Sequence, residues 1–528
     1  MTALGAPVKA LGAPMTALGA SATALGAAVL AAPVVVVVAS LVEPSTDTWS
    51  HLWQTRLVEM LVSTAVLAVG VVAASLVVGT AAAWLVAAHD FPGRRLLGWL
   101  LALPLALPGY VSGFTWLDVT GRQGLVMAAV VLTASLYPYV YLLTLAAFRE
   151  QSARTVEAAR TLGCSRWRAW WRVVLPLARP SLAAGAALVA MEVLTDVGTV
   201  RLFDVTTVAD GVFRVWFGLD DRDGAAELAS VLVGAAVVMV TVERLARGRA
   251  RFVQRGGRDT GVAARRVRGA RGIAVAAGPV VLLLVALGVP LVRLVPWAWT
   301  TVAEGQGRTV SGGAVDHLLD SLLVVSLAVV VTVVAGTALA LAGRLGRARA
   351  ARVLARVATT GYAVPGPVVA VGVLVCVAWL EAQGWWPAGW ALAGTLGVLV
   401  YALAVRYVAV AHAAVAASAD KVPERVVEAA RTLGSGQGAV ALRVELPLVR
   451  PGVVVAAALV GIDVVKELPV TLLLRPFGVD TLPVWVWQAT SDSRWEQAAV
   501  PGLLVAGLAS VGVAVLLAAL ARGAEMVA

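Results

Sequence analysis

Long apolar runs separated by short polar stretches make up most of this chain of 528 residues. A helix that crosses a bilayer needs about 20 mostly apolar residues, and many runs reach that length. The first set of predicted spans covers residues 24–42, 60–88, 96–118, 125–148, 181–199 and 225–246. The second set covers residues 273–296, 318–343, 357–380, 390–413, 452–474 and 498–521. The pattern predicts an all-α integral membrane protein of about 12 transmembrane helices, in two sets of six.

Composition supports this fold class. Hydrophobic residues make up 60% of the chain, charged residues make up 14%, and the mean hydropathy is +0.87, far from the values of soluble domains. Residues 1–23 repeat Thr-Ala-Leu-Gly-Ala fragments, so we expect a low-complexity cytoplasmic tail; a true start at Met15 or later is an equal alternative. The other predicted domains are a first transmembrane half at 24–246, a basic cytoplasmic linker at 247–272 and a second transmembrane half at 273–528.

One polar block occurs twice in the chain. Glu-Ala-Ala-Arg-Thr-Leu-Gly stands at residues 157–163 and again at 428–434, and Leu-Pro follows at 175–176 and at 446–447. Both matches have the same offset of 271 residues (428 − 157 and 446 − 175), which indicates an internal duplication. Each block falls between the fourth and fifth predicted spans of its half. The two halves are therefore expected to be parallel six-helix repeats.

Each block predicts a helix–turn–helix element. Glu-Ala-Ala-Arg favours a helix that is too short and polar to cross a membrane, the glycine permits a sharp turn, and Leu-Pro ends the second short helix. The alternative is a helix that only lies on the lipid, but two copies with the same spacing argue against it. We therefore predict a coupling loop in each half. Its candidate residues are Glu157, Ala158, Ala159 and Gly163 in the first copy and Glu428, Ala429, Ala430 and Gly434 in the second.

The positive charges orient the predicted spans. Arginine clusters occupy one set of alternate loops, including both repeated blocks and the linker, whereas the opposite loops hold only a few scattered arginines. This asymmetry predicts that both termini and both blocks are cytoplasmic, in a multi-pass protein of the bacterial inner membrane. The net charge of +11 is explained by these loops, so we expect membrane lipids and not nucleic acid as partners.

Ionisable residues near the fifth and eleventh spans are candidates for a substrate pathway: Glu192, Asp196, Asp463, Lys466 and Glu467. Under the offset of 271, the first two align with Asp463 and Glu467. Such groups cost about 2.5–3.5 kcal/mol each at membrane depth and persist when they are paired or face a cavity. The alternative is that the lysine pairs with a neighbouring carboxylate and only holds helices together. Tyr110 and Tyr362, which flank Pro-Gly breaks in the third and ninth spans, complete the candidate set.

The two blocks carry a resemblance to a known family. Glu-Ala-Ala, three residues, Gly and a later Leu-Pro resemble the signature of the permease subunits of binding-protein-dependent ABC importers. The resemblance implies that the two loops dock on two copies of a separate ABC ATPase, and that an extracytoplasmic substrate-binding protein delivers the ligand. No G-x-x-x-x-G-K-[ST] loop occurs in the chain. We therefore expect ATP and Mg²⁺ to be bound by the partners, and no cofactor to be bound by this chain.

Several further stretches look like fused iron(III) permeases. They lie at residues 89–95, 103–110, 191–199, 464–469 and 474–482. Fused thiamine and phosphonate permeases share parts of them, so these ligands stay open. An ion-coupled secondary transporter is the alternative class, although such a carrier needs no docking loop. The four histidines are scattered and form no catalytic set or metal site, so we do not expect an enzyme.

Overall fold

The computed structural model describes residues 26, 28–42, 46–151, 153–247, 265–303, 307–345, 364–384 and 391–525. These residues are almost entirely helical, and the described strands, β1 (His89–Asp90) and β2 (Arg265–Arg266), form one short parallel pair. The all-α membrane fold class is confirmed. Seven described helices are long and apolar enough to cross a membrane, or up to ten if each of three bent helix pairs is one span. Two shorter apolar helices, Ala28–Val42 and Gly366–Ala382, overlap predicted spans, and the count of twelve stays a prediction.

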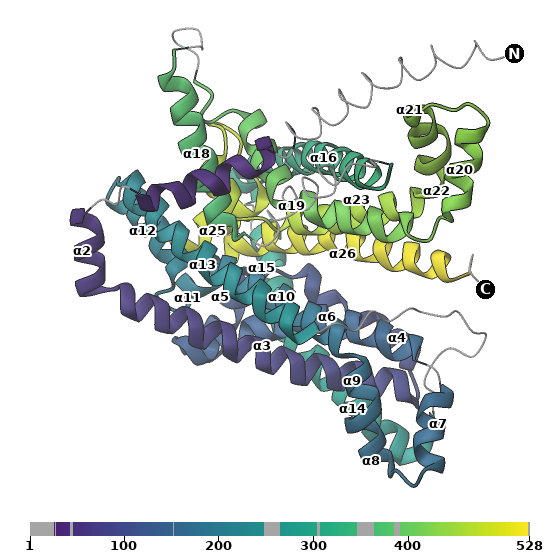
Figure 1. The fold of residues 1–528 in the computed structure, drawn as a ribbon. Coiled ribbons are helices and arrows are strands. Elements are labelled where there is room, and N and C mark those ends of the chain that lie inside the picture. Colours follow the sequence, from purple (N-terminus) through teal and green to yellow (C-terminus); the bar gives the residue numbers. More distant parts are fainter. Residues whose placement is uncertain are drawn as a thin grey trace, which may run out of the picture. The chain divides into compact units, whose positions relative to one another are not determined.

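The described residues form two compact units. The first unit contains α2 (Thr46–Thr55), α3 (Leu57–Ala88), α4 (Arg94–Leu100), η2 (Leu103–Ala106), α5 (Gly109–Thr120), α6 (Leu125–Glu150), α7 (Ala153–Thr161), α8 (Arg166–Ala169), η3 (Trp170–Val174), α9 (Leu175–Leu177), α10 (Arg179–Thr195), α11 (Gly198–Leu202), α12 (Val208–Gly218), α13 (Arg222–Arg247), α14 (Gly269–Leu283), η4 (Leu284–Gly288) and α15 (Val289–Ala303) (Figure 1). It also contains residues 485–507, which include most of α25 (Leu482–Ser491) and the start of α26 (Trp495–Glu525).

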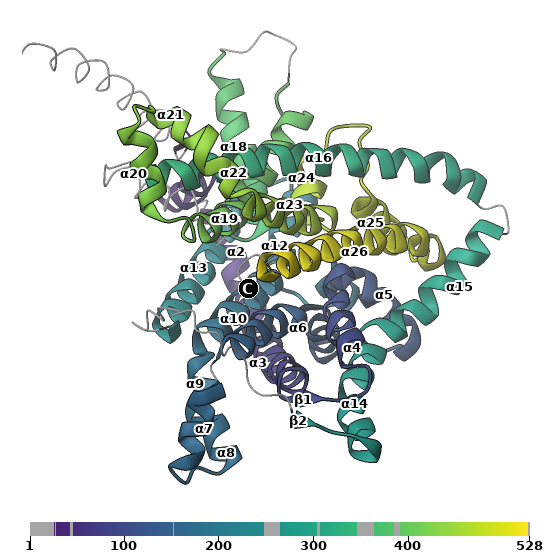
Figure 2. The ribbon, with the colours of Figure 1, turned by 90° about the vertical axis from the view of Figure 1, so that its right-hand side faces the viewer.

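The second unit is built mainly from the second half of the chain. It contains the helix Ala28–Val42, whose last turn is η1 (Ser40–Val42), α16 (Gly307–Leu345) from residue 315 onward, α18 (Gly366–Ala382), α19 (Leu396–Ala419), α20 (Glu424–Thr432), α21 (Gln437–Val440), η6 (Ala441–Glu445), α22 (Leu446–Leu448), α23 (Arg450–Val465), α24 (Pro469–Leu474) and the end of α26. The same helices can be followed from a second direction (Figure 2).

Three helices, α3, α6 and α10, pack against one another and form the centre of the first unit. Small residues set their separation. A Cβ atom on Gly79 of α3 would lie 2.8 Å from Cβ of Val140 in α6, and one on Gly185 of α10 would lie 3.0 Å from the Val140 Cα. Glycine therefore allows the backbones to approach closely, as is common between membrane helices.

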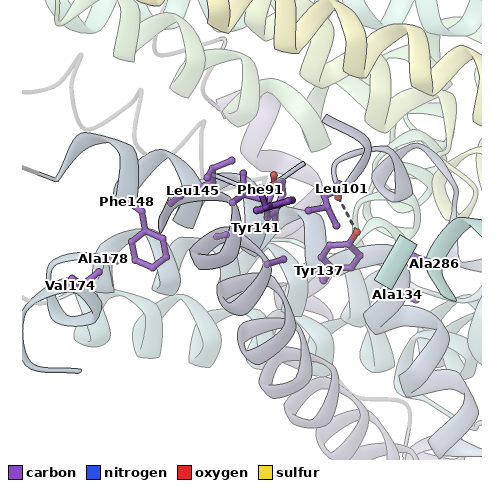
Figure 3. Packing of buried hydrophobic residues seen from close by; sticks show 14 residues of the cluster. Phe91, Leu101, Ala134, Tyr137, Tyr141, Leu145, Phe148, Val174, Ala178 and Ala286 are labelled. Carbon is purple, nitrogen blue, oxygen red and sulfur yellow. Dashed lines mark hydrogen bonds between the residues drawn. The ribbon is translucent and has the colours of Figure 1, made fainter. Parts of the chain in front are cut away.

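A cluster of buried hydrophobic residues joins α6 to the segments before α5 (Figure 3). Two tyrosines fix this contact through their hydroxyl groups. Tyr137 donates to the carbonyl of Leu101 at 3.0 Å, and Tyr141 donates to the carbonyl of Gly98 at 2.8 Å. Because these hydroxyls are paired, the rings can be buried without leaving a polar atom unsatisfied.

Each compact unit includes the first predicted span of the other sequence half. In the second unit, a Cβ atom on Gly372 of α18 would lie 2.2 Å from the carbonyl oxygen of Pro33, so the helix Ala28–Val42 crosses α18 at van der Waals distance. In the first unit, Arg293 of α15 pairs with Asp118 of α5, and Trp297 stacks on Phe114 with ring centroids 6.2 Å apart. The sequence repeat thus divides the chain into two halves, but the compact units follow a different division. The first predicted span of each half packs in the unit that is formed mainly by the other half. The predicted domain boundaries at 23, 246 and 272 stay a prediction.

Candidate functional site

The first repeated block forms a helical hairpin, here called the first knuckle (residues 153–177). Helix α7 ends in a pair of hydrogen bonds: the Gly163 amide donates to the Arg160 carbonyl at 3.0 Å, and the Cys164 amide donates to the Ala159 carbonyl at 3.1 Å. This is the Schellman arrangement, in which a left-handed residue reverses the chain and satisfies the last carbonyls. The chain then continues into α8 and η3.

The second repeated block forms the second knuckle (residues 424–448) with the same bonds. The Gly434 amide donates to the Arg431 carbonyl at 3.0 Å, and the Ser435 amide donates to the Ala430 carbonyl at 3.1 Å. Gly163 and Gly434 have φ angles of +85° and +84°, and an added Cβ would meet nothing within 4 Å at either position. The requirement for glycine therefore comes from the backbone conformation and not from space.

The two knuckles expose the same positions. Glu157, Ala158 and Gly163 are exposed and Ala159 is half-buried, and Glu428, Ala429, Gly434 and Ala430 repeat this pattern. At the turn itself, Leu162 is 85% exposed and Leu433 is 86% exposed. Each turn therefore presents a large apolar side chain that the described residues around it leave uncovered. The coupling role of these residues stays a prediction.

Each knuckle is joined to a spanning helix without a loop. The first knuckle passes from η3 through α9 into α10 with a bend of 65°, and the second passes from η6 through α22 into α23 with a bend of 73°. A π-helical turn stands at the matching place in both copies, before the Leu-Pro. Figures 1 and 2 show both hairpins at the ends of their helices. A displacement of either hairpin would therefore be transmitted to a membrane helix.

The contacts that hold the two knuckles differ. In the first, Trp170 packs edge-on against Trp84 of α3, with ring centroids 6.1 Å apart. In the second, Glu445 of η6 is fully buried and lies 2.9 Å from Nε of Arg344, at the end of α16. The same guanidinium donates to the carbonyls of Ala419 and Val422. One knuckle is thus fixed by aromatic packing, and the other by a buried ion pair.

A second pair of matching features lies where α10 and α23 end. Asp196 accepts hydrogen bonds from the amides of Thr199 at 2.9 Å and Val200 at 3.1 Å. In the second unit, Glu467 accepts one from the amide of Val470 at 2.9 Å. Each carboxylate therefore satisfies the first amides of a short helix, α11 or α24, that follows a break in the span. The offset of 271 relates the two carboxylates (196 + 271 = 467) and also the amides that donate to them (199 + 271 = 470).

The other predicted pathway residues also have partners within their own unit. Tyr139 donates to Glu192 at 3.4 Å in the first unit, and Lys466 lies 3.1 Å from Asp463 in the second. The pairing of the lysine with a neighbouring carboxylate, the structural alternative weighed above, is therefore present. The pathway role stays a prediction, and a paired group can also line a pathway.

The Pro-Gly break before Tyr110 lies against the carboxylate break in the first unit. The helical segments on either side of it meet at 93°. A Cβ on Gly109 would lie 2.7 Å from Oγ1 of Thr199 and 3.5 Å from Oδ2 of Asp196. Tyr110 is buried at the start of α5, whereas Tyr362 lies outside the described residues.

Several polar contacts were missed by the sequence predictions. Glu467 also accepts a hydrogen bond from Tyr407 at 2.6 Å and lies 3.5 Å from Arg406, both in α19. The signal for Arg406 is visible in the sequence, because a lone arginine inside an apolar run must find a partner. No comparable signal marks Arg344 and Glu445, which stand in polar segments 101 residues apart (445 − 344).

The structure thus contains two duplicated knuckles, and each continues into a helix that is apolar enough to belong to a membrane span. The chain belongs to the family described as the binding-protein-dependent transport system inner membrane component, which matches residues 21–242 and 332–524. Membership implies that an ABC ATPase and a substrate-binding protein act with it.

Individual relatives are transport permeases. The chain is 26% identical over 459 residues to an Fe(3+)-transport system permease protein, FbpB 2, of Haemophilus influenzae, covering 86% of this chain and 88% of that protein. It is 31% identical over 185 residues to the sulfate transport system permease protein CysT of Escherichia coli, covering 31% of this chain and 67% of that protein. It is 28% identical over 222 residues to the molybdenum transport system permease protein ModB of Escherichia coli, covering 37% of this chain and 93% of that protein.

Proposed function

We propose that this chain forms the translocation pathway of an ATP-driven importer for iron(III), with one ATPase subunit docked on each of its two knuckles. The observation that carries the proposal is the duplicated hairpin, with the same left-handed glycine, exposed glutamate and direct continuation into a spanning helix. A carrier coupled to an ion gradient needs no such pair of hairpins. The chain itself does not hydrolyse ATP and acts as a transport subunit.

In the proposed cycle, ATP binding draws the two ATPase subunits together and each subunit carries its knuckle with it. Because η3–α9 and η6–α22 continue into α10 and α23, the knuckle motion reaches the breaks capped by Asp196 and Glu467. The pathway alternates between two arrangements because the ATPases bind one of them better. In this proposal both knuckles and both termini lie on the cytoplasmic side, and the arginine-rich loops support that orientation.

Iron(III) is the ligand that the comparisons favour. The iron(III) permease relative covers both halves of the chain, whereas the sulfate and molybdenum permease relatives each cover less than half of it. Hard cations prefer oxygen ligands, and the described helix breaks carry carboxylates. Glu192, Asp196, Asp463 and Glu467 would attract a cation during its passage. Thiamine and phosphonates are the alternatives.

A strain that lacks this chain tests the ligand directly. Uptake of ⁵⁵Fe(III) supplied as citrate is compared with uptake of [³⁵S]sulfate, [⁹⁹Mo]molybdate and radiolabelled thiamine, with and without a plasmid copy of the chain. We expect only the iron uptake to fall and to return with the plasmid. Loss of sulfate, molybdate or thiamine uptake with normal iron uptake would overturn the assignment of the ligand but not the transporter class.

The energy source separates the proposal from a secondary transporter. The vesicles are right-side-out and are freed of inside-out ones. Iron uptake into them should stop when internal ATP is removed with an ATP-consuming enzyme. It should persist when a protonophore collapses the proton gradient while ATP is maintained. The opposite pattern would reject the ATP-driven class and favour the ion-coupled alternative.

A further inference from the structure

A large groove lies in the first unit where the end of α3 meets the first knuckle and the start of α10. Its volume is about 1280 Å³. Residues of α3, α10 and the first knuckle supply most of its lining. In the orientation proposed above, the knuckle end of the groove lies at the cytoplasmic membrane surface, where lipid head groups meet acyl chains.

The walls of the groove are apolar. Val77 of α3 is 71% exposed, and the indole of Trp171 is 49% exposed. The Trp170 ring lies edge-on to that of Trp171, with centroids 4.7 Å apart, and both rings line the groove together with Leu182 of α10. Tryptophan is enriched at this depth of a bilayer because its ring is amphipathic. Such a trough suits acyl chains.

The polar part of the groove is positively charged. Arg160 of the knuckle, Arg179 at the start of α10 and Arg265 of β2 line it, and no carboxylate does. Among the described residues, none of these three arginines takes part in an ion pair. His89 lines the groove as well, and burial together with the charges of Arg265 and Arg94 lowers the pKa of its imidazole. The groove thus joins an apolar trough to a site for negative charge.

We propose that this groove binds an anionic phospholipid, with its acyl chains along α3 and α10 and its phosphate among Arg160, Arg179 and Arg265. Basic pockets beside membrane helices on the cytoplasmic side bind anionic head groups in this way. The bound lipid fills the space between the first knuckle and α3, and so stabilises a knuckle that lacks the Arg344–Glu445 type of brace. This lipid site depends on the proposed function in one respect only, namely that the first knuckle lies on the cytoplasmic side of the membrane.

Quenching of tryptophan fluorescence by brominated lipid tests the site. The full chain is reconstituted in phosphatidylcholine nanodiscs, and brominated phosphatidylglycerol or brominated phosphatidylcholine is titrated in. We expect phosphatidylglycerol to quench at a lower mole fraction than phosphatidylcholine. This selective part of the quenching should shrink when Trp167 and Trp171 are replaced by phenylalanine, because both rings line the groove.

Paired variants assign the charge. The double variant Arg179→Gln with Arg265→Gln should weaken the affinity for phosphatidylglycerol, read from the quenching titration. The expected loss is roughly five-fold for each arginine, about 25-fold in all. Arg95→Gln with Arg268→Gln removes the same charge from exposed residues that do not line the groove, and should change little. Lysine at 179 and 265 should restore most of the binding.

Three results would overturn the proposal. The first is equal quenching by both lipids, which would indicate only annular lipid. The second is an equal loss in the two charge-matched double variants, which would place the anion elsewhere. The third is protection of the groove tryptophans from both lipids, which would mean that protein fills the groove. None of these results depends on ATP or on uptake, so failure of the lipid site is distinguishable from failure of the transporter assignment.

Discussion

Replacing Gly434 by alanine should loosen the turn of the second knuckle without creating a clash. The residue has φ +84°, and an added Cβ would meet nothing within 4 Å. The cost is therefore the intrinsic penalty of a left-handed conformation for a residue with a Cβ, about 1–2 kcal/mol. That penalty raises the population of the opened turn about 5- to 30-fold.

Gly436→Ala is a matched control in the same turn. Gly436 also has open space around an added Cβ, but its φ is −67° and its ψ is 161°, a conformation that alanine adopts readily. The control should leave the turn unchanged or stabilise it by about 0.4–1 kcal/mol, because alanine reduces the freedom of the unfolded chain.

Hydrogen exchange of the knuckle amides measures the effect. The Ser435 amide, which bonds to the Ala430 carbonyl at 3.1 Å, reports opening of the turn. Its protection should fall about 5- to 30-fold in Gly434→Ala and should not fall in Gly436→Ala. Equal protection in the two variants would refute the argument that the left-handed backbone is what requires glycine here.

Three further predictions concern buried contacts. Glu445→Gln removes the counter-charge of Arg344, whose side chain is half-buried, so it should destabilise the chain by up to about 3–5 kcal/mol in thermal unfolding. Glu424→Gln, at an exposed position of α20, should change little, and equal stability of the two variants would contradict the ion pair. Gly109→Ala forces a Cβ to 2.7 Å from a threonine hydroxyl, so overpacking should lower the free energy of unfolding by about 1–3 kcal/mol. Gly70→Ala, whose Cβ meets nothing within 4 Å, should not lower it. An unchanged stability of Gly109→Ala would contradict the close approach. Glu467→Gln should lower iron uptake more than it lowers ATPase activity if this carboxylate lines the pathway, and unaltered uptake would reject that role.

The two helical hairpins were predictable because their signals are local. Helix propensity, a glycine six residues after the glutamate and a following Leu-Pro specify the turn before any tertiary contact forms. Both copies accordingly show the expected helix, left-handed glycine and continuation into a spanning helix. Asp196 and Glu467 were found for a related reason, since charge in an apolar run is conspicuous.

The exchange of first spans was not predictable from the repeat. Hydropathy gives the length of a helix but not its neighbours, and the close approach of the helix Ala28–Val42 to α18 at Gly372 appears only in the folded chain. The Arg344–Glu445 ion pair that holds the second knuckle could not be predicted from the sequence for the same reason. Arg344 and Glu445 each look like ordinary loop charges until folding places them 2.9 Å apart.

The central claim is that each knuckle binds an ATPase subunit. A photo-crosslinking amino acid placed at Leu162 or at Leu433, the exposed side chains of the two turns, tests it in native membranes. Trp53, which is 59% exposed and is predicted to lie on the opposite side of the membrane, is the control. The account predicts that both knuckle positions capture a protein with a G-x-x-x-x-G-K-[ST] phosphate loop, identified by mass spectrometry, and that the control does not. Capture of lipid alone at both knuckles would contradict the account.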